Sequence, residues 1–411
     1  MNTTPRKKPG PKNKPKLKAT DIQGAKYLSN ITDLLKPLQS HCDCANRKLH
    51  YDEYIAFILL YFFTPVLTSM RGLQQASHFE HLHKKLKLGR FSLGSFSEAG
   101  SVFDPQMLDP IIEELGDKIT AVQDNPLLAS TDLAITAADG TLLHALPKMA
   151  WALWLDGENR AAKMHVEFEI LKGIPTKVSI THGNGDERTV LAENLAPGHL
   201  YVLDRGYAEY GLMARIIQAQ SSFVVRIRKN AVYEIIEERP ISQAAERAGV
   251  QRDLIVKLGS TAAPELHDKQ IRLIQIHKTD LNALLGRPRK KRVSSDKSKR
   301  TDKPDHTLLL ASDELYLEAD IVGEFYRSRW QVEIFFRWFK KILQADHPLS
   351  LCENGFTIVA YCAIIASLLV VLWTGRKPTK RTYEMICFYF LGWVTEHELI
   401  AHIEKLGPAA D

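Results

Sequence analysis

The chain has 411 residues, of which 45% are hydrophobic and 25% charged, so it can bury a large core and form two or three domains. Five cysteines are too few and too irregularly spaced for a disulfide framework, which excludes the disulfide-rich secreted class and favours a reducing compartment. The first twenty residues are basic and lack an apolar stretch, so we expect no signal peptide.

The net charge of +6 is unevenly distributed. Residues 1–18 and 287–303 each carry a net charge of +7, which leaves the rest of the chain net acidic. Both stretches are rich in basic residues with Pro or Ser, a composition typical of disordered segments. Two such stretches favour a polyanion partner, because each phosphate neutralised releases counterions. A solubilising or targeting role is the alternative.

Residues 1–20 are predicted to be a disordered basic tail, followed by a helical N-terminal, DNA-binding domain at residues 21–128. From residue 129 the pattern changes to a mixed α/β layer. The predicted order is strand, strand, strand, helix, strand, helix, strand, at residues 133–140, 161–170, 176–181, 186–196, 199–207, 210–220 and 221–229.

Residues 230–305 interrupt this order and predict a mostly β insertion with a basic linker. A strand at 306–312 returns to the core, which we expect to comprise residues 129–229 and 306–375, with a helical segment at 376–411. Residues 241–259 could form a helix-turn-helix, although their second half is β-branched, as in a strand.

An uncharged run at residues 356–373 just reaches the length of a membrane span. A single late segment flanked by globular sequence is typical of a buried core helix, so we expect no membrane association; a membrane protein is the alternative.

A predicted helix at residues 326–340 carries polar groups along one side. At about 100° per residue, four of them fall within an arc of roughly 60°: Tyr326, Arg329, Glu333 and Lys340. The adjoining arc is apolar and predicts packing on a core: Val332, Phe335, Phe336, Phe339, Ile342 and Leu343. The polar stripe is either a solvated face with weak ion pairs or an arranged site.

Asp139 and Asp204 each follow an apolar strand. Taken singly, each suits a turn or cap. If the strands are neighbours, however, the two carboxylates meet and require a cation. Glu333 could add a third oxygen ligand. A set of three carboxylates favours Mg²⁺ or Mn²⁺, and two such ions about 4 Å apart would activate a nucleophile on a phosphodiester.

The spacing Tyr326-x2-Arg329-x3-Glu333-x6-Lys340 resembles the Y-R-E-K signature of the DDE transposases of bacterial insertion sequences, family four. The sequences ADGT at Asp139 and VLDRGY at Asp204 are similar to the family's two aspartate motifs. The resemblance covers roughly residues 60–375. Further similar segments are RGLQQ, SFSEA, KMHVEFEILKGIPTKVSITHG and GVQRDLIVKLG.

The resemblance implies a ribonuclease-H-like mixed sheet core with helices, a mostly β insertion and a helical N-terminal domain. It implies cut-and-paste DNA transposition, in which Asp139, Asp204 and Glu333 hold two Mg²⁺ or Mn²⁺ ions. Tyr326, Arg329 and Lys340 would hold terminal phosphates. The implied partners are the terminal inverted repeats and target DNA, bound by a homodimer. The implied location is the bacterial cytoplasm, at the nucleoid.

Further candidates surround this set. Arg205, Tyr207 and Lys163 could contribute to the phosphate path, whereas His165 fits a packed strand position. Hairpin-forming relatives stack a flipped base on an aromatic residue of the insertion; here Phe223 or Tyr233 would have to serve. A metal cluster at residues 41–44 with His50 fits no standard zinc spacing.

Two other functions stay open. One is a DNA-binding protein of transposase descent that has lost cutting, and the other is a different two-metal nuclease of the same fold. The intact set of three carboxylates disfavours the first. The Tyr, Arg and Lys around Glu333 disfavour the second, because a nuclease does not need to retain DNA ends.

Overall fold

The computed structural model describes residues 34–41, 48–80, 83–84, 88–122, 125–154, 156–259, 266, 268–277, 307–345 and 349–405. Both basic stretches and residues 42–44 of the possible metal cluster lie outside these ranges. The chain divides into two compact units, residues 1–103 with 379–410, and residues 104–378. The boundaries thus lie at 103–104 and 378–379, compared with expected positions near 128 and 375.

The first unit is helical and packs through aromatic rings. Tyr51 stacks on Phe103 with ring centroids 4.4 Å apart, and Phe63 stacks on Phe390 at 4.9 Å, which joins the C-terminal helices to the N-terminal ones. Ser92 caps its helix by accepting a hydrogen bond from the backbone N–H of Ser95. The helices are η2 (Lys36–His41), α2 (Tyr51–Phe63), α3 (Met70–Ala76), α5 (Leu93–Val102), α14 (Lys380–Phe390) and α15 (Glu396–Lys405).

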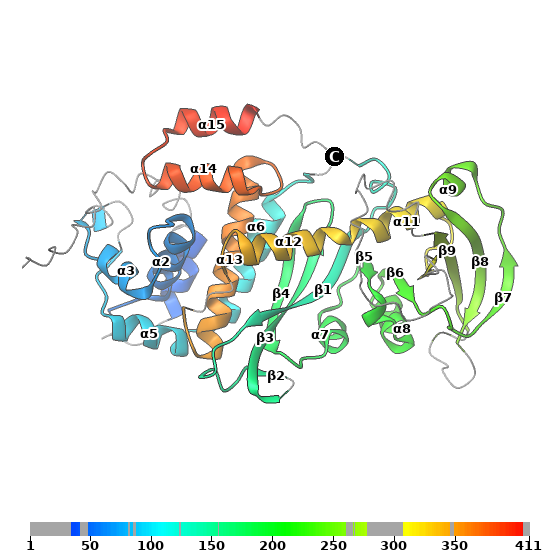
Figure 1. Ribbon diagram of the computed structural model, residues 1–411, viewed down its shortest axis with the longest axis horizontal. Helices are drawn as coiled ribbons and strands as arrows, with labels where there is room; N and C mark the ends of the chain where they lie inside the picture. Colours follow the sequence, from blue (N-terminus) through cyan, green and yellow to red (C-terminus); the bar gives the residue numbers. More distant parts are fainter. Residues whose placement is uncertain are drawn as a thin grey trace, which may run out of the picture. The chain divides into compact units, whose positions relative to one another are not determined.

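The second unit is built on a mixed sheet with the strand order β2-β3-β1-β5-β6-β10-β9-β8-β7, and β4 pairs with β3 (Figure 1). The strands are β1 (Ala134–His144), β2 (Leu153–Trp154), β3 (Asp156–Glu169), β4 (Ile174–His182), β5 (His199–Leu203), β6 (Ser222–Ile227), β7 (Tyr233–Glu238), β8 (Val250–Leu258), β9 (Gln270–His277) and β10 (Thr307–Ser312).

The centre of this sheet has a ribonuclease-H-like topology. β1, β3 and β4 form an antiparallel meander, whereas β5 pairs in parallel with β1, and β6 pairs in parallel with β5. Apolar side chains on both faces of β5 and β6 are buried, as expected for parallel strands covered by helices. The predicted α/β class is confirmed, and the strands predicted at residues 161–170 and 176–181 form the antiparallel pair β3 and β4.

The expected β insertion extends this sheet. β10 pairs antiparallel with both β6 and β9, so β9, β8 and β7 continue the core sheet outward. A buried ion pair, Arg272 Nη2 to Asp253 Oδ2 at 2.7 Å, joins β9 to β8. The helix-turn-helix interpretation is wrong: only α9 (Gln243–Arg247) is helical there, and the β-branched residues after it form β8.

Helices cover both faces of the sheet (Figure 1). Tyr201 and Leu203 pack with the buried residues of α8, so the alternating residues of β5 face the opposite side, where α11 contacts the sheet. The helices of this unit are η3 (Pro105–Leu108), α6 (Asp109–Lys118), α7 (Glu187–Asn194), η4 (Arg205–Tyr207), α8 (Tyr210–Gln218), α9, α11 (Ala319–Ser328), α12 (Trp330–Lys341) and α13 (Glu353–Thr374).

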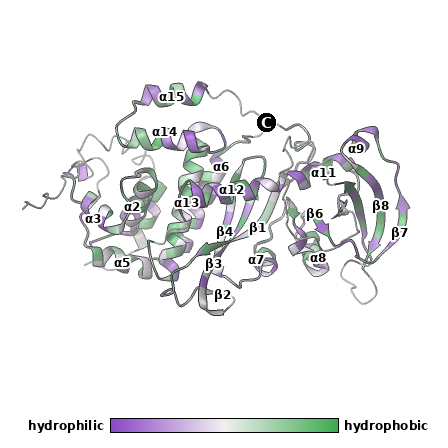
Figure 2. Cartoon of the chain, viewed as in Figure 1, coloured by the Kyte–Doolittle hydropathy of each residue, from purple (hydrophilic) through white to green (hydrophobic). Residues whose placement is uncertain are grey.

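Helix α13 contains the long apolar run. It is the one helix in the described ranges that could cross a membrane by length and composition, yet 94% of its most apolar window is buried inside the protein. Figure 2 shows hydrophobic colouring along it. Tyr361 donates a hydrogen bond to the Val178 carbonyl of β4, and Ser367 accepts one from Trp338 of α12. α13 is therefore a core helix, as expected.

The signature residues lie on two consecutive helices. The expected continuous helix is interrupted at Arg329, which ends α11 and precedes α12 while keeping right-handed helical dihedral angles. There the Arg329 N–H bonds to the Tyr326 carbonyl and the Val332 N–H to the Arg329 carbonyl, both three residues apart. The hydrogen bonds there are of the 3₁₀ type, so the α-helical pattern is interrupted at Arg329, while the backbone keeps a helical conformation from α11 into α12. The apolar side chains expected beside the stripe are buried, apart from half-buried Ile342.

Candidate active site

Asp139 and Asp204 are brought together by the parallel pairing of β1 and β5. Ala138 is the register partner of Leu203, so the two aspartates come next on adjacent strands. Asp204 follows the end of β5, as expected. Asp139 lies in the middle of β1, because β1 continues to pair with β3 as far as His144. Pairing with β5 nevertheless stops at Ala138, so Asp139 is still at the carboxyl edge of the parallel pair.

Arg329 connects Asp139 to Glu333. Its Nη1 is 3.0 Å from Asp139 Oδ2, and its Nη2 is 2.7 Å from Glu333 Oε1. The arginine side chain is only 11% exposed. Two charge-assisted hydrogen bonds from one guanidinium in a largely water-excluded site hold the two carboxylates around a shared positive charge. The sequence predicts that Arg329 contacts a phosphate, whereas the structure pairs it with the carboxylates of Asp139 and Glu333.

Asp204 is held by a different pair of groups. The Tyr326 hydroxyl donates a hydrogen bond to Asp204 Oδ1 at 3.2 Å, and Arg226 Nη1 is 3.7 Å from the same oxygen. Burial raises the pKa of the tyrosine to about 12, and the negative charge of Asp204 adds to that shift. Tyr326 therefore stays protonated and acts as a hydrogen-bond donor. Sequence reasoning missed Arg226, which stands in the apolar alternation of β6.

Lys340 lies on the β1 side of the site. Its ammonium donates to Thr141 Oγ1 at 2.7 Å and to the Leu142 carbonyl at 2.5 Å. These contacts position the lysine two and three residues beyond Asp139 along β1. All four signature side chains thus lie along the strand edge that carries the two aspartates.

The Asp139 carboxyl has a pKa raised to about 6. Burial is the largest cause, and the charges of Glu187 and Glu333 add to it, whereas Arg329 and the Gly140 N–H oppose it. An acid that is destabilised in its charged form by burial and neighbouring carboxylates is a site at which added positive charge is favourable.

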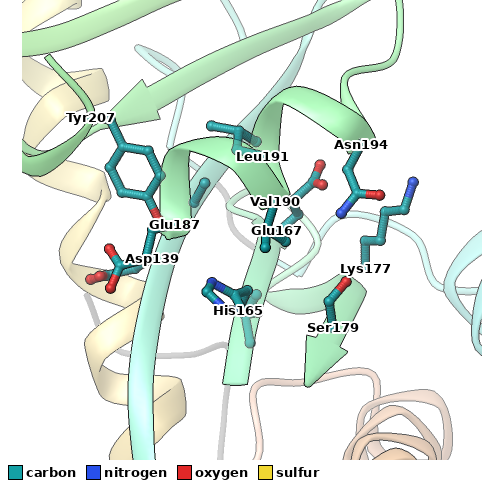
Figure 3. Close-up of a pocket in the computed structure, with 12 residues that line it drawn as sticks. Asp139, His165, Glu167, Lys177, Ser179, Glu187, Val190, Leu191, Asn194 and Tyr207 are labelled. Carbon is teal, nitrogen blue, oxygen red and sulfur yellow. The ribbon is translucent and has the colours of Figure 1, made fainter. Parts of the chain in front are cut away.

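Glu187 is a further carboxylate that sequence reasoning did not single out. It opens α7 after the Asp186 cap, and its Oε1 is 3.3 Å from Lys163 Nζ. Burial raises the pKa of Tyr207 well above its usual value, and the charge of the hydrogen-bonded Glu187 adds to the shift. Figure 3 shows the Tyr207 hydroxyl beside Glu187 and Asp139. Lys163 and Tyr207 therefore contact Glu187, next to Asp139.

A small cavity of about 10 Å³ lies behind Asp139, between β3 and α7 (Figure 3). That volume is close to the minimum that admits one water molecule. His165 and Glu167 line it from β3. Burial lowers the pKa of His165 to about 4 and raises that of Glu167 to about 7. His165 donates to or accepts from Thr181 Oγ1 at 2.8 Å, so it is a packed strand residue, as expected.

A second, basic pocket of about 270 Å³ lies next to Asp204, away from the small cavity at Asp139. Four cationic residues line it together with Asn230: Arg205, Arg226, Arg228 and Lys229. None of its lining residues within the described ranges is acidic. The carboxylates are thus flanked by positive charge on two sides, by Lys340 toward β3 and by this pocket toward β6.

The carboxylates fit a divalent cation in chemistry, because hard oxygen ligands suit Mg²⁺ and Mn²⁺. Arg329 already places a cationic group between Asp139 and Glu333. The distances are nevertheless not those of a metal centre: in the described part of the chain, no group of three or more His, Cys, Asp or Glu could hold a metal ion as it stands.

The aromatic candidates for stacking a base differ in exposure. Phe223 is fully buried in the sheet core, so the interpretation that it stacks a DNA base is wrong. Tyr233 lies on the edge strand β7 and is half-buried, which leaves its surface accessible.

Comparisons with known proteins identify the family of this chain. The family described as "Transposase DDE domain" matches residues 130–369. A protein named as transposase y4zB from Sinorhizobium fredii is 27% identical over 62% of this chain and 65% of its own length. A protein named as a transposase for insertion sequence element IS5377 of Geobacillus stearothermophilus is 22% identical over 59% and 56%. This chain thus covers less than two thirds of these two relatives.

A longer alignment reaches a protein of Synechocystis named as a transposase for insertion sequence element IS4SA, 21% identical over 75% of this chain and 80% of the relative. Among solved structures, the piggyBac transposase synaptic complex with hairpin DNA is similar over 95% of this chain and 83% of that one, with 12% identity and a TM-score of 0.40. Because the family match covers more than half of its residues, the chain belongs to the transposase DDE domain family.

Proposed function

We propose that the protein is a DNA transposase that cuts and joins DNA at the ends of an insertion sequence. The observation that carries this proposal is the pairing at the sheet edge: Arg329 joins Asp139 to Glu333, beside Asp204 on the next strand. Three carboxylates with interleaved cations suit a phosphodiester, which needs positive charge on its oxygens and an activated nucleophile.

Asp139, Asp204 and Glu333 would hold the divalent cations, which we propose to be two Mg²⁺ or Mn²⁺ ions. Such ions supply activation of water or a 3′-hydroxyl and stabilise the leaving oxygen. The protein residues bind and orient the strand. Tyr326 stays a donor because of its raised pKa, and Lys340 is fixed by Thr141 for a phosphate oxygen.

The basic pocket supports a DNA partner. Arg205, Arg226, Arg228 and Lys229 surround a space large enough for a phosphate group, next to Asp204. Arginine forms bidentate hydrogen bonds with phosphate, which fixes a strand in register without reading its sequence. Because two ends must be cut and joined, we propose a homodimer assembled on DNA, acting in the bacterial cytoplasm at the nucleoid.

The test is a cleavage assay with a short duplex that carries the element's own terminal repeat and flanking DNA. The expected result is end-specific cutting in Mg²⁺ by the wild-type protein and none by Glu333→Gln, with DNA affinity retained in the variant. Binding without cutting by the wild-type protein would instead favour a DNA-binding descendant.

A further inference from the structure

Both oxygens of Asp139 already have donors in the free protein. Oδ1 accepts the Gly140 N–H at 2.8 Å, and Oδ2 accepts Arg329 Nη1 at 3.0 Å. The second nitrogen of the same guanidinium, Nη2, donates a hydrogen bond to Glu333 Oε1 at 2.7 Å. An ionised carboxylate offers about four lone-pair sites, so these donors leave some of them open. The Arg329 guanidinium, however, lies between Asp139 and Glu333, and its positive charge repels a second cation at that position. Occupation of Asp139 and Glu333 by a metal ion therefore competes with Arg329.

We propose that Arg329 is an exchangeable counter-ion of this site. It bridges Asp139 and Glu333 while the protein is free, and it moves to a DNA phosphate when a divalent cation takes its place. This inference rests on the proposed function, because it treats the carboxylates as cation ligands. Its consequence is that metal and DNA each promote binding of the other.

A DNA phosphate can replace the carboxylates as the partner of the Arg329 guanidinium, so the arginine keeps a counter-charge after the exchange. Arginine pairs bidentately with carboxylate and with phosphate alike. Without DNA, removal of Arg329 from the carboxylates leaves a buried guanidinium without a counter-charge, which is costly. With DNA, that cost is offset. Lysine at this position could not bridge two carboxylates in the same way, since an ammonium is a compact point charge.

The size of the effect follows from the fraction of molecules in which the bridge is open. If the bridged form holds about nine molecules in ten, the apparent dissociation constant for the cation is about tenfold higher than that of an open site. DNA that accepts Arg329 recovers up to the same factor, and reciprocity requires the cation to tighten DNA binding equally.

The experiment measures Mn²⁺ binding to the full-length protein by electron paramagnetic resonance, without any need for turnover. The variants are Arg329→Gln and Arg329→Lys. The matched control is Arg226→Gln, which removes a cation 3.7 Å from Asp204 that forms no bridge to a second of the three carboxylates. Titrations are repeated with a terminal-repeat duplex that has no flanking DNA and a 3′-dideoxy end. Circular dichroism confirms that each variant is folded.

In the absence of DNA, both Arg329 variants should bind Mn²⁺ about tenfold more tightly than wild type, with a smaller change for Arg226→Gln. DNA should tighten Mn²⁺ binding by wild type more than by Arg329→Gln. Unchanged or weaker binding in both Arg329 variants would overturn the inference. The inference would also be overturned if Arg329→Lys bound Mn²⁺ as wild type does, or if Arg226→Gln gained as much affinity as Arg329→Gln. Either result would mean that the net charge of the site, and not the Arg329 bridge, sets the Mn²⁺ affinity.

A separate variant distinguishes this inference from the proposed function. Asp139→Asn should abolish the tight Mn²⁺ site. If it does so while the Arg329 variants are unchanged, the inference alone fails. If Asp139→Asn and Glu333→Gln bind Mn²⁺ as well as wild type, the cation is held elsewhere, and the proposed function fails together with the inference.

Discussion

Gly140 lies directly beneath the side chain of Glu187. A β-carbon at Gly140 would be 2.7 Å from Glu187 Oε1, closer than real β-carbons approach other atoms, and 3.1 Å from Glu187 Cγ, which is tighter than most real contacts. An alanine after Asp139 would therefore displace the Glu187 side chain, whereas the φ of Gly140 itself is not in the left-handed region. The absence of a side chain at Gly140 lets Glu187 reach Lys163 and Tyr207 next to Asp139.

Gly140→Ala should accordingly destabilise the protein by about 1–3 kcal/mol, because Glu187 must move and lose both contacts. In urea unfolding, the double variant Gly140→Ala/Glu187→Ala should be more stable than the sum of the two single effects predicts, since the added methyl then has space. Gly206→Ala is the matched control, because nothing lies within 4 Å of a β-carbon there. Strict additivity of the two changes would contradict this account.

Removal of charge from the basic pocket should weaken DNA binding in a salt-dependent way. Arg228→Ala and Lys229→Ala should each reduce the slope of log affinity against log salt by about 0.9, the value for one phosphate contact. Lys257→Ala, an exposed cation on β8, is the control with the same loss of charge. Fluorescence anisotropy at several salt concentrations measures the slope. Equal effects of the pocket and control variants would mean that the pocket does not hold phosphate.

Lys340 and Lys341 offer a matched pair of neighbouring lysines. Lys340 contacts Thr141 and the Leu142 carbonyl at the site, whereas Lys341 is exposed. Loss of one charge-assisted contact of about 1.5–3 kcal/mol corresponds to a loss of about 10- to 100-fold. Lys340→Ala should therefore reduce end cleavage by that factor, with Lys341→Ala near wild type in the same assay. The assignment fails if the two variants behave alike.

Glu167 predicts a pH dependence of stability. Burial raises its pKa from 4.5 to about 7, so the folded state holds its proton more tightly than the unfolded chain. The stability that the neutral carboxyl contributes is fully present below pH 4.5 and is lost as the pH rises through 7. At pH 8 the buried charge costs on the order of 3 kcal/mol.

Glu167→Gln removes this titration without a change of shape. The variant should have a higher thermal midpoint than wild type at pH 8 and nearly the same midpoint at pH 4.5. Glu193→Gln, a substitution on α7 with no such burial, should show little difference at either pH. A constant offset between Glu167→Gln and wild type across this range would contradict the assigned pKa.

The local elements were accessible from sequence because their patterns are short-range. The β3–β4 hairpin follows from alternation around a Gly-containing turn, and α7 follows from its Asp186 cap. The signature residues were identified from their spacing and family resemblance. Asp139 and Asp204 could be placed together only on the assumption that β1 and β5 are neighbours, which is a long-range pairing.

The partners of these residues could not be predicted in the same way. Arg226 and Glu187 lie on β6 and α7, far in sequence from Glu333, and their proximity depends on strand order and on the packing of α7. The pairing of Arg329 with two acids likewise depends on where α12 crosses β1. The extension of the core sheet by the insertion was not predicted. It arises because β10 pairs with β6 on one edge and with β9 on the other, and the alternation of residues within a strand does not indicate which strands are its neighbours.

A strand-cleavage assay on a miniature element with its own terminal repeats and flanking DNA decides whether the protein is a transposase or a DNA-binding descendant. The duplex is incubated with purified protein in Mg²⁺ or in Ca²⁺, and the products are resolved on a denaturing gel beside Glu333→Gln. We expect end-specific nicks or hairpins with wild type in Mg²⁺ only, and none with the variant. End binding without strand cleavage by wild type in Mg²⁺, or cleavage retained by Glu333→Gln, would contradict it.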